Sequence, residues 1–583
     1  MTGIAVFDWL LHFRVEMAVA AGATVLLWLA LRWRLRGGWL LVLACLPVAL
    51  VLLKADVRTY SYHGLLHVSL VYRLLAGPFP PTDAFFAGEP LTYPWAHHAL
   101  VGVFARLLSA DPFTIFASMN LALLALTVFT LYRTAAELFE EPPARALAVV
   151  PALFGLSLFS RGPLWWLLAV KLHFWPVTRV LPVEKFAHVT SNGFGVLFFA
   201  IHLLAVVRIF GVRGARWRDG ALLGGAVLGA ALFYPAAWGA IALSAAASAG
   251  VLWWRQPRER AHALLVTAVS GAAGTAIALP YLWLIRFGRN PAAALQWSET
   301  AGWVGWKMAV VLVSVSALAV LSWFFRAELR RAIVAAPAVW LVVATTALLN
   351  FAMYVAFRAT YGNEYKFLLF GSQALGLAAG APLAALWRKN SAVWFAVVGF
   401  WILPAASHGL ELLKTTFGDP SRMVADGWVL HQTDPARDRL NRWIRKETAR
   451  DAAIVDSELS VGPFAHRSLF VVLGREFLPL PDGDTLHGWS LAPAEFLHNL
   501  FGHELDSIRH RWQLVLAILD PARPRANDEE LRELRELTGA SEIYVVVRDR
   551  RRQRPLDQDP RFERVYHDPP FAVFELTSKA EGS

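Results

Sequence analysis

The ionisable residues that could carry out chemistry are concentrated between residues 54 and 98, in a segment that joins two long apolar runs. Charge next to lipid is costly, so a membrane protein that gathers it in one place is expected to use it there. Carboxylates and imidazoles can accept or release protons, and histidines can also bind metal ions. The segment contains Asp56, Arg58, His63, His67, Asp83, Glu89, His97 and His98.

Asp56 follows an apolar run that ends near Leu53, which predicts that its carboxylate lies at a membrane boundary. An ionised carboxylate placed deeper would cost roughly 2.5–3.5 kcal/mol on insertion scales. At the boundary this cost falls, and the group can act where lipid meets water. We therefore predict a functional carboxylate at Asp56. The alternative is an ion pair at a helix end, with Lys54 or Arg58.

The spacing of the histidines predicts that they lie on helix surfaces and do not form a metal centre. His63 and His67 are four residues apart and share a helix face, but no third ligand follows at the spacing of a metal motif. His97 and His98 are consecutive, so at most one of them is expected to face a site. The segment HNLFGHE, at 498–504, lacks the H-E-x-x-H spacing of a zinc peptidase and predicts a helix surface.

A second group of charges precedes another apolar run. The sequence RATYGNEYKF places Arg358, Glu364 and Lys366 in a hydrophobic frame, where charge is expensive. A phosphate or an acidic partner is therefore expected beside them. The alternative is an interfacial lysine that reaches the membrane surface and pairs with the glutamate.

The remaining segments offer less chemistry. The aromatic segment 171–193 contains Glu184, Lys185 and His188. It could line a substrate groove, although packing against neighbouring segments is favoured. The sequence has no Walker motif, no G-x-G-x-x-G after a strand and no G-x-S-x-G. Nucleotide-dependent chemistry and serine hydrolysis are therefore unsupported.

The composition is that of a multi-pass membrane protein. Of 583 residues, 56% are hydrophobic and 17% are charged, and the mean hydropathy is +0.45. Ordinary soluble proteins have about 25% charged residues. The apolar runs are long enough to cross roughly 30 Å of hydrocarbon. We predict about twelve spans, near 15–31, 38–53, 113–131, 145–160, 194–210, 220–234, 235–254, 262–285, 303–325, 332–357, 366–386 and 391–408.

Positive charge predicts the orientation of these spans. The net charge is +11, and most of the surplus arginine lies in short turns between apolar runs. Such charge reports topology rather than nucleic-acid binding, and the turns that carry it face the cytoplasm. The loop 54–112 and both termini are then outside. The basic turns lie near residues 32–36, 133–145, 208–218, 255–260, 326–331 and 388–389.

The residues after His408 are polar and mixed in charge, which predicts a soluble α/β domain at 409–583 after a membrane core at 1–408. In NDEELRELRELTG, Asn527 is a candidate N-cap and Gly539 a stop signal. RDRRRQRP predicts a solvated loop. Further helices are predicted in DRLNRWIRKETARD and AEFLHNLFGHELDSIRHRWQLVLAIL, and strands in AAIVD, SEIYVVVRD and FERVYHDPPFAVFELT.

Several of these features together resemble a known family. An acidic residue after an early helix, a surface helix, the segment AGEPLTYPWAHH and the helix DPFTIFASMNLALLALTVFTLYRTAAELF follow in order. This arrangement is similar to membrane glycosyltransferases of the GT-C superfamily, including the mannosyltransferase and aminoarabinose-transferase types. The C-terminal segments resemble the outer domain that often follows that membrane core. The fold expected is mostly α, a polytopic helical core followed by an α/β domain.

The resemblance implies that a sugar is carried on a polyprenyl phosphate and moved to a glycan, lipid or protein acceptor on the outer side. The first-loop acid of the family matches Asp56, as general base or orienting group. Many members carry a second acid beside it, whereas Val57 stands here, which weakens the case for a bound Mg²⁺ or Mn²⁺. The implied substrate-binding residues are Arg58, Asp83, Glu89, His98, Arg358, Glu364 and Lys366, of which Arg58, Arg358 and Lys366 are candidates for the lipid phosphate.

Two other classes of protein remain open at this point. A transporter or flippase of lipid-linked glycans would place charge near mid-membrane, whereas the ionisable residues here lie mostly at span ends. A non-catalytic scaffold would use its outer domain to bind a partner. For the enzyme, we expect the inner (plasma) membrane of a bacterium, membrane lipid around the core, an extracytoplasmic C-terminal domain and no nucleic-acid partner.

Overall fold

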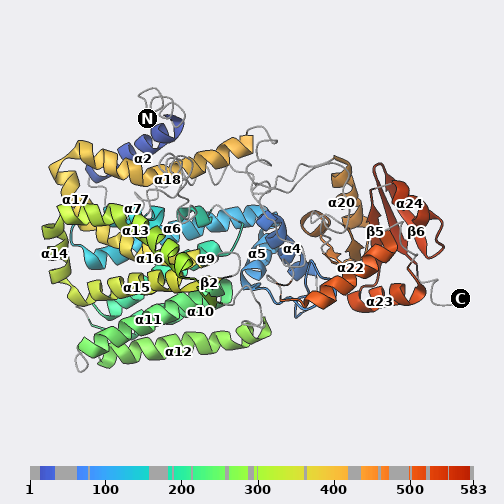
Figure 1. The fold of residues 1–583 in the computed structure, drawn as a ribbon, viewed down its shortest axis with the longest axis horizontal. Coiled ribbons are helices and arrows are strands. Elements are labelled where there is room, and N and C mark those ends of the chain that lie inside the picture. The colour runs from blue at the N-terminus through green and yellow to red at the C-terminus, as the bar shows by residue number, and fades with distance from the viewer. Residues whose placement is uncertain are drawn as a thin grey trace. The chain divides into compact units, whose positions relative to one another are not determined.

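The structure is a computed structural model in which helices dominate (Figure 1). Seven of the helices described are long and apolar enough to cross a membrane, which makes the chain a multi-pass membrane protein. The residues divide into two compact units, described separately here: unit 1 is 1–55, 117–282 and 295–417, and unit 2 is 56–116, 283–294 and 418–583. The structure describes residues 14–32, 62–76, 79–156, 182–186, 189–211, 214–255, 261–285, 295–298, 300–359, 364–417, 435–456, 461–471, 498, 502–519, 526–548 and 550–577.

Unit 1 is built from the predicted apolar spans, and eleven of the twelve coincide with helices. The twelfth, 38–53, lies outside the described residues. The helices and short elements of unit 1 are α2 (Arg14–Arg32), α6 (Pro112–Leu138, from residue 117), α7 (Pro142–Phe154), η3 (Val183–Phe186), α9 (Asn192–Ile209), α10 (Trp217–Phe233), α11 (Pro235–Arg255), α12 (Ala261–Leu284), β1 (Leu295–Trp297), α13 (Ala301–Phe324), α14 (Arg326–Ala335), α15 (Pro337–Ala356), β2 (Phe357–Ala359), α16 (Tyr365–Gly376), η6 (Leu377–Ala379), α17 (Gly380–Lys389) and α18 (Ser391–Phe417).

The helices of unit 1 differ in how much of their surface other helices cover. In the continuous segment α16–η6–α17, 94% of the residues in its apolar stretch are buried, whereas the corresponding shares for α12 and α13 are only 33% and 28%. Large apolar side chains are exposed on these two helices, including Ile277 and Leu312. Apolar surface of this kind suits contact with lipid. The central segment therefore positions side chains inside the unit, and α12 and α13 are its lipid-facing helices.

One predicted span begins later than expected. The span at 332–357 starts at Pro337, because residues up to Ala335 belong to the separate helix α14. This helix has no buried residues and carries Arg330 and Arg331, so it is a polar connection rather than part of a span. Proline at the first position of α15 suits a helix start, where its missing N–H has no intrahelical partner to lose.

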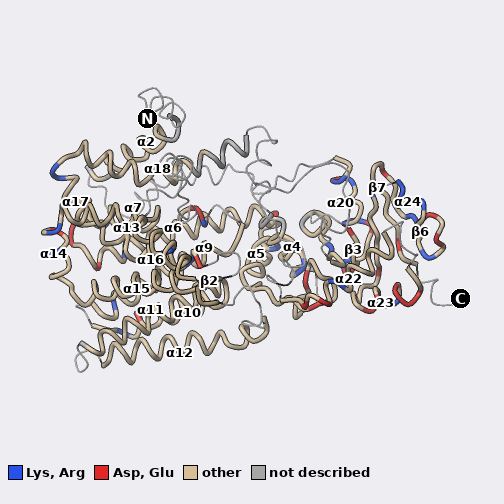
Figure 2. Tube along the Cα trace, in the orientation of Figure 1, with Lys and Arg blue, Asp and Glu red and all other residues tan. Residues whose placement is uncertain are grey.

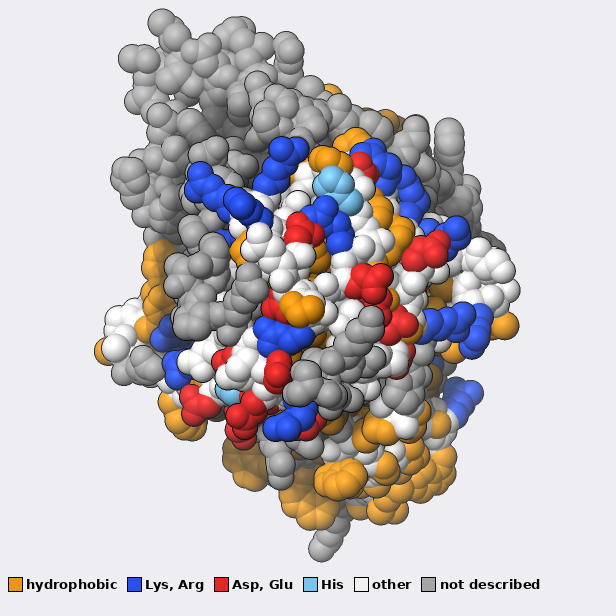
Figure 3. All heavy atoms as spheres, turned by 90° about the vertical axis from the view of Figure 1, so that its right-hand side faces the viewer, with side chains coloured by type: hydrophobic (Ala, Val, Ile, Leu, Met, Phe, Trp, Pro, Cys, Tyr) orange, Lys and Arg blue, Asp and Glu red, His pale blue; other side chains and the backbone are white. Residues whose placement is uncertain are grey.

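Unit 2 contains the predicted α/β structure. Its sheet has five strands in the order β4-β3-β5-β7-β6. β3 (Ala453–Val455) runs parallel to β4 (Ser468–Leu469) and β5 (Ile543–Val547), while β7 (Phe571–Leu576) is antiparallel to β5 and β6 (Phe562–Asp568). Charged residues are sparse along unit 1 but frequent along these elements (Figure 2). Both signs of charge are interspersed over the end of the molecule that Figure 3 draws.

The helices of unit 2 confirm most predictions from sequence and correct two. α23 begins at the predicted N-cap Asn527, which forms a capping box with Glu530, and Gly539 ends the helix in the left-handed conformation. The predicted loop RDRRRQRP instead begins helix α24. The long helix predicted at 494–519 is interrupted at Gly502, whose φ is 70°, and α22 begins at Leu505. The helices are α4 (Tyr62–Ala76), α5 (Ala96–Leu108), α20 (Pro435–Glu447), the π-helical turn η7 (Val461–Ala465), α22 (Leu505–Leu519), α23 (Asp528–Thr538) and α24 (Arg550–Asp557).

The outer-loop segment 79–91 and the C-terminal sheet share one hydrophobic core. Phe85 and Phe86 are buried in the same cluster as the strand residues Val545 and Phe574. The backbone also takes part, since the N–H of Ala87 donates to the carbonyl of Leu469 at 2.9 Å. Residues far apart in sequence therefore fold as one unit.

Arg511 holds the segment 79–91 against the rest of unit 2. Its guanidinium is buried, donates to the carbonyls of Ala87 (2.6 Å), Phe470 (3.1 Å) and Leu537 (3.2 Å), and lies 3.9 Å from the ring centre of Phe86. A rigid fork of donors suits three carbonyls at once. Burial lowers the pKa of Arg511 to about 10, so the group remains a cation at neutral pH.

Gly88 provides a test of this junction. Its φ is +88°, and a Cβ there would lie 2.2 Å from the carbonyl oxygen of Leu537. Gly88→Ala should therefore lower the apparent melting temperature of the detergent-purified protein. The loss of stability should exceed that from backbone strain alone, which costs about 1–2 kcal/mol. The matched control is Gly539→Ala, whose φ is +57° with nothing within 4 Å of the added Cβ. Equal melting temperatures for the two variants would contradict the close contact.

Candidate functional site

The predicted site residues lie in both units. Asp56 and Arg58 fall outside the described residues. Asp83, Glu89 and His98 belong to unit 2, and Arg358, Glu364 and Lys366 belong to unit 1. Each group is therefore examined within its own unit.

Asp83 is a fully buried carboxylate with two partners. One oxygen accepts the backbone N–H of Phe85 at 2.7 Å, and the other lies 2.8 Å from Nε2 of His503. This arrangement closes a turn and joins it to the C-terminal half of unit 2. The prediction that 498–504 forms a helix surface is wrong for His503, which precedes α22 and is buried against Phe86. His498, by contrast, is helical. The geometry gives Asp83 a positioning role in the fold.

Glu89 lies beside the same junction but remains accessible. Its carboxylate is 3.6 Å from the guanidinium of Arg511 and its side chain is 41% exposed. It accompanies the arginine that binds the loop backbone. An accessible carboxylate beside a held cation is free to contact a ligand, so the substrate-binding role of Glu89 stays a prediction.

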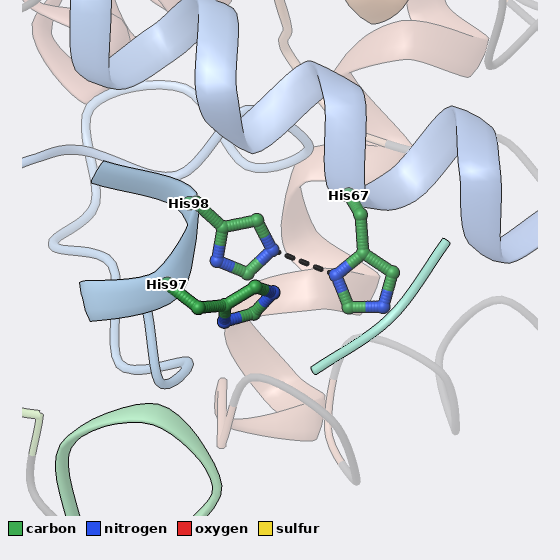
Figure 4. Close-up of side chains that lie close together, drawn as sticks. All are labelled: His67, His97 and His98. Carbon is green, nitrogen blue, oxygen red and sulfur yellow. Dashed lines mark hydrogen bonds between the residues drawn. The ribbon is translucent and has the colours of Figure 1, made fainter. Parts of the chain in front are cut away.

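Three histidines of unit 2 converge in a buried cluster (Figure 4). His67 comes from α4, and His97 and His98 come from the first turn of α5. One nitrogen from each ring lies within 4.8 Å of the others. Nδ1 of His67 is 2.7 Å from Nε2 of His98, and the rings of His97 and His98 are 3.6 Å apart. All three side chains are at most 2% exposed.

The cluster corrects two predictions from sequence. His67 is not on a helix surface, and His97 and His98 do not point apart, because the first turn of α5 presents both rings toward α4. Neither ring nitrogen of His97 has a hydrogen-bond partner among the described residues. A buried polar group without a partner costs about 1–3 kcal/mol. Burial lowers the pKa of His97 to about 3 and holds that of His98 well below its ordinary value, so both imidazoles are neutral at pH 7.

His67 is separated from His97 and His98 by thirty residues or more, which explains why sequence spacing missed the cluster. A metal motif on one helix is visible in the sequence, whereas a ligand set divided between two helices becomes visible only when the helices pack. The adjacent pair His97 and His98 was the available signal.

In unit 1, Glu364 is held by a cation that the sequence analysis did not single out. Lys307 of α13 lies 3.1 Å from the Glu364 carboxylate, and both side chains are almost fully buried. Lys307 also donates to the carbonyl of Phe357. Arg358 follows in β2, with its guanidinium 5.9 Å from the Trp303 ring. Glu364 is therefore the acidic partner of Lys307 in a buried ion pair.

Lys366 lies in a different part of unit 1, in a small recess shared with Lys185. The ammonium of Lys366 lies 4.9 Å from the centre of the Tyr234 ring, and that of Lys185 lies 4.6 Å from the Tyr365 ring. Among the described residues, no carboxylate lies within 4 Å of either ammonium. The recess is lined by Lys185, Asn192, Tyr234, Tyr365, Lys366, Leu369 and Phe370.

Within 171–193 the structure describes residues 182–186 and 189–193, which are mostly buried, so both the packing and the groove alternatives stay predictions. Lys185 belongs to the short helix η3, is only 5% exposed and lines the recess together with Lys366. Two like charges that share an apolar frame repel one another, and an anion beside them would relieve that repulsion.

The fold was compared with known proteins. No protein-family model and no curated protein matches the chain. Solved structures that are similar include ArnT from Cupriavidus metallidurans bound to undecaprenyl phosphate, with 11% identity, a TM-score of 0.46 and coverage of 94% of this chain and 99% of that chain.

Two further structures are similar over much of the chain. The apo oligosaccharyltransferase of Archaeoglobus fulgidus has 10% identity, a TM-score of 0.41 and coverage of 86% of this chain and 68% of that one. The arabinofuranosyltransferase AftD from Mycobacteria has 15% identity, a TM-score of 0.43 and coverage of 90% and 41%. By name, both of these proteins are sugar-transferring enzymes.

The buried pair of Lys307 and Glu364 makes a prediction about stability. Lys307→Met leaves the Glu364 carboxylate buried without its ammonium, which should destabilise unit 1 by about 3–5 kcal/mol. The double variant Lys307→Met/Glu364→Leu removes both charges and should recover most of that loss. Thermal unfolding of the detergent-solubilised protein measures both. A double variant less stable than Lys307→Met would show that the two side chains do not act as a pair.

Proposed function

We propose that the chain is an integral-membrane glycosyltransferase. It takes a sugar from a polyprenyl-phosphate carrier and transfers it to a glycan, lipid or protein acceptor on the outer face of the membrane. The observation that carries this proposal is the recess of unit 1, where Lys185 and Lys366 have no carboxylate within 4 Å among the described residues. Two neighbouring ammonium groups without a carboxylate favour an anion beside them.

Phosphate is the anion that this recess favours. Two ammonium groups supply donors and charge, and the hydroxyls of Tyr234 and Tyr365 and the amide of Asn192 can add neutral hydrogen bonds. Tyr365 and Lys366 are the first two residues of α16. The N-terminus of a helix presents unpaired N–H groups and a partial positive charge, which also favour an anion.

A lipid-borne phosphate is favoured over a free one because the recess belongs to the membrane-spanning unit. Lys366 begins the apolar segment Tyr365–Lys389, which is long enough to cross a bilayer. A phosphate attached to a polyprenyl chain reaches such a position through the lipid, and its tail can follow the apolar surfaces of the unit. A donor that is already lipid-linked also fits a sequence without a nucleotide-binding motif.

In the transfer step, a hydroxyl or amide of the acceptor attacks the anomeric carbon of the sugar. The bond between that carbon and the phosphate oxygen breaks, and the phosphate leaves with the bonding electrons. Lys185 and Lys366 stabilise the departing charge. Asp56 takes the acceptor proton, or orients the acceptor group, as the new bond forms.

The remaining predictions from sequence complete the proposal. The basic turns favour a position outside the cytoplasm for the loop after Asp56 and for the C-terminal domain. Asp83, Glu89 and His98 would then lie on the same side as the acceptor. Arg58 and Arg358 would support donor binding. The membrane is the inner membrane of a bacterium.

The recess predicts that Lys185 and Lys366 bind the donor. In proteoliposomes supplied with polyprenyl-phosphate pentoses and hexoses, Lys185→Met and Lys366→Met should each raise the KM for the donor about tenfold or more, because each removes a charge-assisted contact to phosphate. Both variants should also weaken binding of sugar-free polyprenyl phosphate, measured by thermal stabilisation. The control is Lys446→Met, whose ammonium is exposed and pairs with Glu447. Donor kinetics unchanged in both recess variants would remove the recess as the phosphate site.

The proposed role of Asp56 predicts that its substitution impairs sugar transfer but leaves binding of polyprenyl phosphate unchanged. Asp56→Asn keeps the side-chain shape but cannot accept a proton, so kcat should fall about 100-fold or more while polyprenyl phosphate binds as in the wild type. The control is Asp506→Asn, a 96% exposed carboxylate of α22. Retained transfer in Asp56→Asn would remove it as the base. Absence of transfer by the wild type with every donor would favour a transporter or a scaffold.

A further inference from the structure

The cluster of His67, His97 and His98 is the strongest feature of unit 2 that the proposed function does not use. All three imidazoles are buried, and they come from two packed helices, α4 and α5. One nitrogen of each ring lies within 4.8 Å of the other two. Figure 4 shows the rings directed toward one another rather than toward separate neighbours.

Hydrogen bonding does not account for this arrangement. The only bond drawn among the three rings joins Nδ1 of His67 to Nε2 of His98. Both ring nitrogens of His97 are buried and lack a hydrogen-bond partner in the part of the chain that the structure describes. A ring aimed into a cluster with neither of its nitrogens satisfied indicates that a ligand belongs there.

We propose that His67, His97 and His98 bind one zinc ion through one imidazole nitrogen each. Three imidazoles are the ligands of zinc and neighbouring transition metals, whereas Mg²⁺, Mn²⁺ and Ca²⁺ prefer oxygen. The site therefore differs from the Mg²⁺ or Mn²⁺ considered for the acidic residues of the loop. It also does not depend on glycosyl transfer, because metal content can be measured without a substrate.

The geometry is compatible with this ion. Zinc–nitrogen bonds of about 2.0–2.1 Å in a tetrahedral site place the ligand nitrogens roughly 3.3 Å from one another. The nitrogens of His67 and His98 are closer than this, at 2.7 Å, and all three lie within 4.8 Å. Rotation of the side chains within their helices brings the set to the required spacing without moving the backbone. The ring of Phe116, 6.1 Å from that of His97, forms an apolar wall.

The fourth position of the ion is left to a small molecule. Among the described residues, no Cys, Asp, Glu or further His joins the three ligands. Zinc with three protein ligands and an open position is the arrangement of catalytic sites, in which the fourth ligand is water or a substrate oxygen. The site therefore supplies an exchangeable position rather than a closed structural one.

The metal content of the purified chain tests the proposal. The full-length protein, carrying a tag without histidine, is purified in detergent, dialysed against a weak chelator and measured by inductively coupled plasma mass spectrometry. The wild type should retain about one zinc per chain, and His97→Gln and His98→Gln should each lower retention about tenfold or more. The control is His510→Gln, an exposed histidine that pairs with Glu533. Zinc carried alike by the wild type and the cluster variants would be adventitious and would overturn the proposal.

A second measurement needs no variant and covers the case in which the glutamine variants do not fold. Cobalt substituted into the wild type should give visible absorption of the intensity typical of four-coordinate Co²⁺. A strong chelator should lower the melting temperature of the wild type, and added zinc should restore it, because an ion that binds only the folded state stabilises it. A wild type without cobalt absorption and without a response to chelator or zinc would refute the site.

Discussion

The arrangement of unit 1 depends on the high cost of charge in an apolar frame. Each buried cation there must meet an anion, a carbonyl or a ring. Lys307 satisfies this constraint within the protein, through Glu364 and a backbone carbonyl. Lys185 and Lys366 satisfy it only through tyrosine rings, and no carboxylate lies beside either ammonium among the described residues. The first site is a neutral pair, whereas the second keeps two positive charges, and the proposed function builds on that difference.

Unit 2 applies a related constraint to polar groups. Arg511, Asp83 and His503 are buried, and each uses its hydrogen bonds to hold outer-loop backbone or side chains against the C-terminal residues. Other buried polar atoms also lack a hydrogen-bond partner among the described residues, including Nε of Arg511. His97 differs in that both of its ring nitrogens are unsatisfied and its ring lies in a cluster of three histidines, so a ligand is expected there. This distinction separates Asp83, a predicted ligand-binding residue with a positioning role in the fold, from the histidine cluster.

Much of the fold could be predicted from the sequence, because it depends on local patterns. Long apolar runs determine the spans, and the capping box at Asn527 with Gly539 determines one helix. The candidate site was harder to predict from the sequence, because the residues that contact one another in it lie far apart along the chain. Nothing near Glu364 in sequence indicates Lys307, and nothing near Lys366 indicates Lys185. The loop predicted at RDRRRQRP failed for a local reason: charge suggested solvent, but arginine is also a good helix former.

The junction between the outer loop and the C-terminal sheet has a consequence for biosynthesis. Asp83 and His503 are separated by 420 residues, and Ala87 and Arg511 by 424. At ribosomal rates of about 5–20 residues per second, the loop waits roughly 20–80 s for the chain that covers it. During that time Phe85 and Phe86 have no partner core, although the surrounding helices are already entering the bilayer. The nascent protein therefore exposes these two aromatic side chains until the C-terminal residues are made, and a chaperone that binds exposed aromatic side chains would find its target there.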